Sequence, residues 1–349
     1  MVIFQNSAGS NSKKKITFKT RIFDIPDIMK DTLKETSIQY EVSPLGFSTL
    51  RTLLYFDIFS YPLTLPEIRT FSGIDIGSYE SLEKEITIMI EVGLIFHFDN
   101  FYSIKNDETA ISRRVKGNQE AEKYIPMARR RAEFISRFPF VRAVMASGSL
   151  SKGYMDEKSD LDFFVVTAPN RLWIARTVFV LYRKMFVPFS RYKEFCTNYF
   201  LASDKLEIEE KNIFTATELA TLIPLCNLGL YLKLMSANTW MHNYLPNFRT
   251  KENWNLNSAG KNGLKWITEK IVDVIFGERL NQFLMNVTLR RLKRKHSHRF
   301  STLDFSLALK TKPHVSKVHL GNNQTRVLSL LQEKIKEFEA RTGLAFNHA

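Results

Sequence analysis

A glycine-serine turn between two apolar segments, with a pair of acids beyond it, is the feature that most constrains this chain. Residues 141–146 are rich in apolar side chains and predict a strand that runs directly into Ser147-Gly148-Ser149. After a polar spacer, residues 160–166 predict a second strand, which opens with Asp160-Leu161-Asp162. Side chains two positions apart in a strand share a face. The two acids should therefore point to one side, and the leucine between them into the core.

This arrangement resembles the signature of the DNA polymerase β superfamily of nucleotidyltransferases, over about residues 139–202. The resemblance implies an α+β fold with a mixed sheet and flanking helices. It also implies transfer of a nucleoside monophosphate from a nucleoside triphosphate, such as ATP, to an acceptor hydroxyl. In this chain Asp160 and Asp162 would bind Mg²⁺ or Mn²⁺, which stabilises the attacking and leaving oxygens. The acceptor is left open: a small molecule, a nucleic acid or a protein.

The residues of the turn suit a phosphate-binding role. Gly148 has no Cβ, so a phosphate can approach its backbone. Ser149 offers a hydroxyl and a backbone N–H at the start of a short helix, and Lys152 follows one turn later. We therefore expect Gly148, Ser149 and Lys152 to contact the nucleotide. The competing interpretation is a solvated loop with a capping serine and two surface acids.

The superfamily usually supplies a third acid from a later strand, and this chain departs from that pattern. Residues 195–201 predict the corresponding strand but contain no Asp or Glu. Asn198 is the best candidate for the third-acid position, although an amide is a poor base. Two interpretations stay open: a metal-dependent nucleotidyltransferase, and a non-catalytic nucleotide-binding regulator.

The pattern along the chain predicts four regions. We expect a mobile leader at 1–43, a winged-helix-like unit of three helices and a hairpin at 44–106, the nucleotidyltransferase core at 107–205, and a helical region at 206–349. The third helix of the winged-helix-like unit would read DNA, but its polar positions carry several glutamates, which oppose phosphate binding. Packing or partner docking is the alternative role. In the last region we expect helices over 211–238, 266–299 and 327–338, with an irregular basic segment at 310–317.

Charge and composition limit the classes of partner. The net charge of +14 favours anionic partners, and the 266–299 helix ends in a basic run from Arg290 to Arg299. This run suggests contact with nucleic acid or anionic lipid, and a nucleic-acid-binding protein that merely retains the fold is a further alternative. We find no signal-peptide pattern and no apolar run long enough to span a membrane, so we expect a cytoplasmic protein. The oligomeric state is left open.

Overall fold

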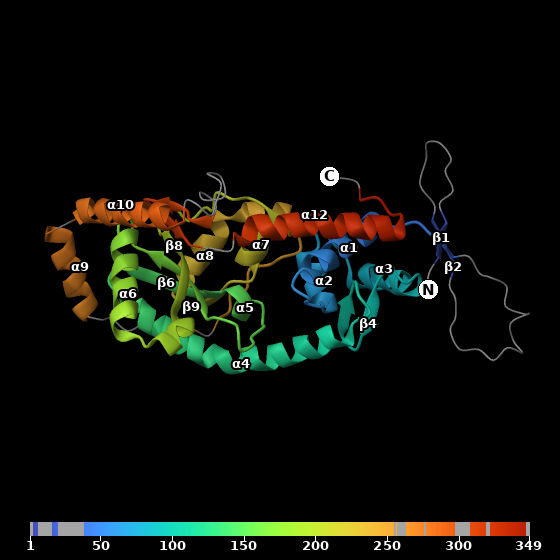
Figure 1. Ribbon diagram of the computed structural model, residues 1–349, viewed down its shortest axis with the longest axis horizontal. Helices are drawn as coiled ribbons and strands as arrows, with labels where there is room; N and C mark the ends of the chain where they lie inside the picture. Colours follow the sequence, from blue (N-terminus) through green and yellow to red (C-terminus); the bar gives the residue numbers. More distant parts are fainter. Residues whose placement is uncertain are drawn as a thin grey trace, which may run out of the picture. The chain divides into compact units, whose positions relative to one another are not determined.

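The computed structural model describes residues 3–5, 16–19, 38–254, 256, 263–275, 277–296, 308–318 and 322–346. The fold is mixed α+β, as the sequence predicts, and includes a six-stranded mixed sheet. The chain divides into two compact units (Figure 1). The first comprises residues 1–112, 245–247 and 328–349, and the second comprises residues 113–244 and 248–327.

The first unit contains the predicted three helices, each started by a polar cap. They are α1 (Pro44–Asp57), α2 (Leu65–Phe71) and α3 (Tyr79–Glu91). Ser43 accepts a hydrogen bond from Gly46 N at the start of α1, and Ser78 does the same from Ser81 N at the start of α3. Such caps satisfy N–H groups that have no partner inside the helix. The helices pack through buried leucine, isoleucine and methionine side chains: Leu50, Leu53, Ile68, Leu82, Ile86 and Met89.

The predicted hairpin follows these helices as β4 (Phe96–Phe98) and β5 (Phe101–Ser103). The long helix α12 (Asn323–Thr342) contributes most of its length to this unit. Within residues 1–43, expected to form a leader, the structure describes three short strands that pair antiparallel: β1 (Ile3–Gln5), β2 (Ile16–Lys19) and β3 (Ile38–Tyr40). Most of the remaining leader lies outside the described residues. The winged-helix assignment of this unit stays a prediction.

The second unit is built on the six-stranded sheet, whose strand order is β10-β11-β8-β7-β6-β9. The strands are β6 (Val141–Ser147), β7 (Asp162–Thr167), β8 (Cys196–Ala202), β9 (Ile223–Cys226), β10 (Thr311–Lys312) and β11 (Val315–Lys317). Strands β7 and β8 run parallel, and every other neighbouring pair is antiparallel.

One face of this sheet packs against two helices, α4 (Glu108–Ser136) and α6 (Leu172–Phe186) (Figure 1). Phe163 and Val165 of β7 belong to this buried cluster, together with Trp173 and Phe179 of α6. The alternation along β7 therefore turns Asp162 and Phe164 towards the opposite face of the sheet. This helix layer leaves that opposite face for the candidate site.

The region expected to be helical over 211–238 is interrupted by a strand, so that expectation was wrong. Helix α7 (Ile213–Ala220) ends before β9, and α8 (Leu228–Ala237) follows it. Strand β9 pairs with β6, so the apolar residues that fit a helical pattern instead extend the sheet. Pro224 disfavours a continuous helix here, because it has no N–H and clashes with the preceding turn.

Two other segments of the C-terminal half also differ from expectation. The helix expected over 266–299 consists of α9 (Gly263–Ile275) and α10 (Gly277–His296). The basic segment at 310–317 forms the β10-β11 hairpin and joins the edge of the sheet through β8. Tertiary pairing provides partners for a segment whose own residues carry little strand signal. The final helix, expected over 327–338, is α12.

Candidate functional site

The glycine-serine turn lies directly against the second acid. Ser147, at the end of β6, is paired with Asp162 at the start of β7. Gly148 follows with a φ of +65°, and a Cβ built on it would lie 2.3 Å from Asp162 Oδ2. Glycine is required here for two reasons: the left-handed backbone and the closeness of the carboxylate. The turn and the acid thus form one continuous polar surface.

Asp160 extends this surface, although β7 begins two residues later than expected. The N–H of Leu161 donates to Lys193 O at 2.7 Å, and its carbonyl accepts from Cys196 N at 3.1 Å, so the backbone pairs with its neighbour ahead of the strand. Leu161 is buried in the core cluster. In extended backbone, its neighbours Asp160 and Asp162 point the other way. The negative charge of Asp160 also acts on Asp162.

Asp162 occupies an environment that disfavours its charged form. Burial is the main reason that the pKa of this carboxyl rises to about 6; the negative charges of Asp160 and Glu218 contribute in the same direction, and Cys196 and Lys152 in the opposite one. A carboxylate held among other acids and away from solvent is stabilised by any cation that approaches it. The turn and the two acids are therefore suited to cation binding.

Asn198 contacts Asp162 directly. Its Nδ2 donates to Asp162 Oδ1 at 2.6 Å, and its own Oδ1 accepts from the Cys196 thiol at 3.1 Å. Thr197 pairs with Phe163 and Tyr199 pairs with Phe164, so Asn198 is the extra residue of a β-bulge. Bulges re-aim side chains. The residue predicted for the third-acid position is therefore next to Asp162, and it offers an amide in place of a carboxylate.

Lys152 lies at the turn but is engaged in an ion pair. Its Nζ contacts Glu218 of α7 at 2.7 Å and Gly148 O at 3.3 Å. Sequence reasoning missed Glu218, because nothing in a single helix sequence indicates that its side chain reaches a turn 70 positions away. Lys152 and Glu218 place one positive and one negative charge beside Asp162.

Lys317 of β11 is a second residue that sequence reasoning missed. It is paired with Tyr199 of β8, which in turn is paired with Phe164, so it lies on the Asp162 face of the sheet. Burial lowers the pKa of Lys317, and the Glu210 and Glu218 carboxylates oppose this shift. The segment 310–317 was expected to be irregular. Without a predicted strand, the sequence could not indicate on which face of the sheet Lys317 lies.

Helix α4 supports the loop that follows the turn. Met155 N donates to Gly117 O at 3.0 Å, and Asn118 Nδ2 donates to Gly153 O at 2.8 Å. A Cβ on Gly117 would lie 2.2 Å from the Tyr154 ring, so this glycine lets the loop pack closely on the helix. The position of the turn is thus fixed by a helix far from the acids in sequence.

The donor set fits Mg²⁺ in part. Mg²⁺ is commonly bound by one or two carboxylates, with phosphate oxygens and waters completing its shell. Asp160 and Asp162 supply two carboxylates, and the backbone of Gly148 lies directly against the second of them. Across the described residues, no group of three or more His, Cys, Asp or Glu side chains could hold a metal ion by itself.

Two other sequence expectations concern surfaces outside this site. On α3, Glu80 and Glu83 are exposed, and Glu80 forms an ion pair with Lys84 at 2.7 Å. The acidic character that argues against DNA reading is therefore present on the helix surface. In the described parts of the chain, no helix is both long and apolar enough to cross a membrane.

Searches of protein-family models, of curated proteins and of solved structures return no match to this chain.

Proposed function

We propose that this protein binds a nucleoside triphosphate with Mg²⁺ and transfers its nucleotidyl group to an acceptor hydroxyl. The observation that carries the proposal is the contact between the turn and the acid: any Cβ at Gly148 would collide with the Asp162 carboxylate. This closeness would let one metal ion bind a carboxylate and a phosphate on the turn together.

In this proposal Asp160 and Asp162 hold the metal, which supplies charge stabilisation for the phosphates. Gly148 and Ser149 cradle the phosphates. Lys152 exchanges its ion pair with Glu218 for a phosphate oxygen, since a polyphosphate carries more negative charge than one carboxylate. A nucleotidyltransferase-type fold of the second unit is part of the same proposal.

Asn198 favours a second candidate function, that of a nucleotide-binding regulator with little or no turnover. Its amide donates to Asp162 where a third acid would help to deprotonate the acceptor hydroxyl. The two candidates share nucleotide binding and differ only in whether pyrophosphate is released.

Binding is tested first, by calorimetric titration of each of the four nucleoside triphosphates with and without Mg²⁺. We expect metal-dependent binding that Asp160→Ala with Asp162→Ala abolishes. The matched control is Glu157→Ala, which removes an exposed acid from the same loop. Absence of binding to any nucleotide with Mg²⁺ or Mn²⁺ would refute both candidates.

Turnover is tested with α-labelled triphosphates and pyrophosphate detection over a panel of small-molecule, nucleic-acid and protein acceptors. Labelled product identifies the enzyme, whereas binding without product supports the regulator. Lys152→Met should weaken triphosphate binding more than monophosphate binding. Lys158→Met is its control, because Lys158 is an exposed lysine of the same loop.

A further inference from the structure

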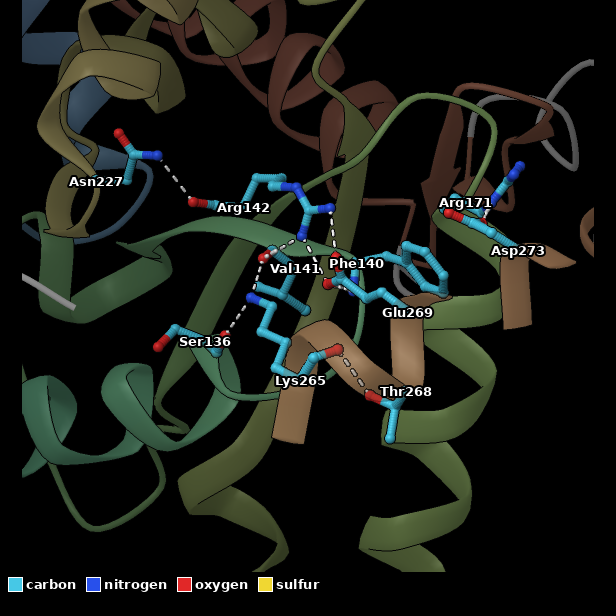
Figure 2. Close-up of polar contacts among 10 residues, drawn as sticks. All are labelled: Ser136, Phe140, Val141, Arg142, Arg171, Asn227, Lys265, Thr268, Glu269 and Asp273. Atoms are coloured by element: carbon cyan, nitrogen blue, oxygen red, sulfur yellow. Dashed lines mark hydrogen bonds and ion pairs between the residues drawn. The ribbon is translucent and has the colours of Figure 1, made fainter. Parts of the chain in front are cut away.

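Helix α9 is attached to the second unit by its polar side (Figure 2). Lys265 Nζ donates to Ser136 O at 2.8 Å and to Val141 O at 2.6 Å. One turn later, Glu269 accepts two hydrogen bonds from the Arg142 guanidinium, at 2.8 and 2.9 Å. These contacts are directed at the body of the unit, where a surface helix usually presents apolar side chains.

Two more polar contacts hold the helix, on the side where Val272 packs against the buried cluster. Glu269 Oε1 also accepts from Phe140 N at 2.6 Å, and Asp273 accepts from Arg171 Nε at 2.6 Å. Although burial works against it, the bonds from Arg142 and Phe140 lower the pKa of Glu269. The helix is therefore anchored at three successive turns: Lys265 binds backbone carbonyls, and Glu269 and Asp273 each pair with an arginine.

As a consequence, the apolar side of α9 faces outward. Val274 is 84% exposed, Leu264 71% and Trp266 63%. Ile267, Ile271 and Ile275 are also exposed. Contiguous large apolar side chains on a surface indicate an interaction site, because single exposed side chains are ordinary but clusters are not. We call these six residues the α9 apolar face.

Along one stripe of helix α10, the exposed side chains change from apolar to basic. Phe283 and Val287 are 61% and 43% exposed. Arg290 and Arg294 are exposed at the next positions of the same stripe, because spacings of three and four share a helix face. A helix surface that combines large apolar groups with arginines suits the boundary between the headgroups and acyl chains of an anionic bilayer.

We propose that α9 and the outward stripe of α10 bind the surface of an anionic lipid membrane, without spanning it. Charge complementarity favours an anionic membrane over the other partners. A second copy carries the same net charge of +14 and is repelled as a whole, whereas anionic lipid attracts the protein. A nucleic acid would satisfy the arginines but has no acyl layer in which to bury leucine and isoleucine side chains. Lys270 lies 5.8 Å from the Trp266 ring, a lysine-tryptophan pairing suited to the bilayer interface.

The test is co-sedimentation of the full chain with phosphatidylglycerol-phosphatidylcholine vesicles and with pure phosphatidylcholine vesicles. We expect binding to the anionic vesicles, and a loss of about tenfold or more in the Trp266→Glu, Ile271→Glu variant. The matched control is Ile88→Glu with Val115→Glu, which charges two exposed apolar residues on other helices and should leave binding unchanged. Circular dichroism confirms that each variant is folded.

Tryptophan fluorescence gives a second readout that does not depend on folding defects in the charged variant. Vesicles should shift the emission to shorter wavelength, and Trp266→Phe should remove that shift while retaining most of the binding. Failure of the wild-type protein to bind anionic vesicles would overturn the proposal. So would vesicle binding that survives Trp266→Glu, Ile271→Glu but is lost on replacing Arg290 and Arg294, since charge alone would then explain it.

Sedimentation velocity and a nucleic-acid titration cover the other occupants. If the wild-type protein does not bind vesicles but forms a dimer, and the Trp266→Glu, Ile271→Glu variant is monomeric, the α9 apolar face binds a second copy. If the protein does not bind vesicles but binds nucleic acid in a salt-sensitive way, the outward stripe of α10 is a nucleic-acid contact. Either result replaces the membrane as the partner.

Discussion

Replacing Asp162 with asparagine is expected to stabilise the ligand-free protein and to remove its affinity for the metal-nucleotide complex. Burial, together with the charges of Asp160 and Glu218, raises the pKa of the Asp162 carboxyl from its ordinary 3.8 to about 6. An amide of the same shape carries no charge and retains an oxygen to accept the hydrogen bond from Asn198. The ionised carboxylate is thus a local source of instability that asparagine relieves.

The magnitude follows from the pKa difference. A shift of about two units, at about 1.36 kcal/mol per unit, corresponds to at most about 3 kcal/mol. The unfolded chain releases this proton near pH 3.8 and the folded chain near pH 6, so the folded state holds more protons between these values. Stability contributed by this group is complete below pH 3.8, falls as the pH rises to 6, and is absent above it. The advantage of Asp162→Asn should therefore grow between pH 4 and 6 and reach about 1–3 kcal/mol at pH 8.

Urea unfolding of both proteins at pH 5, 6, 7 and 8 measures this difference directly. The control is Asp156→Asn, because the Ser159 hydroxyl lowers the pKa of Asp156 and the expected sign is opposite. With Mg²⁺ and ATP at about 100 times the dissociation constant, the wild type should gain about 2.7 kcal/mol and Asp162→Asn should gain nothing. A variant less stable than the wild type at pH 8, or an advantage that does not change with pH, would refute the reasoning.

Three further predictions concern the turn, the bulge and helix α9. Gly148→Ala should destabilise the protein by about 1–3 kcal/mol and abolish nucleotide binding. Gly153→Ala, also at positive φ but with its Cβ 3.2 Å from Asn118 Nδ2 and away from Asp162, should lower stability without a specific loss of binding; unfolding and calorimetry compare the two variants. Asn198→Asp should raise the affinity for Mn²⁺ and lower stability in its absence, and unchanged metal affinity would contradict the assignment of this position. Glu269→Gln should cost about 1–3 kcal/mol in thermal unfolding and increase protease cleavage within α9, because an anchor of this helix is lost; an unchanged melting temperature would show that the ion pair contributes little.

Local pattern was sufficient for much of the fold. Apolar-rich segments predicted strands β6, β7 and β8, and helical spacing with polar caps predicted the three helices of the first unit. The apolar residues of these segments are the ones that the folded elements bury, so short-range sequence information is enough to predict the elements. The closeness of Gly148 and Asp162 follows in the same way, because the end of β6 and the start of β7 are joined by one loop and lie side by side. The nucleotide-binding role of these residues stays a prediction.

Pairing between distant segments was beyond a local pattern. Ile223–Cys226 fits a helix by spacing and became a strand because β6 offered a free edge. Asn198 was placed in the right strand, but the bulge that aims it at Asp162 depends on the register between β7 and β8. The register of parallel strands is a property of two segments together.

The sequence by itself determined which residues could make a turn-and-acid site, because their spacing on one strand and one turn is local. Only the tertiary structure decided which charges lie near it: Glu218, which acts on Asp162, comes from a helix 56 positions beyond it, and Lys317, which interacts with Glu218, from a strand 155 positions beyond it. The same is true of α9, whose periodicity predicts an amphipathic helix but not which side faces out. That choice depends on Arg142 and Arg171, which lie far from α9 in sequence and pair with Glu269 and Asp273 on its inner side.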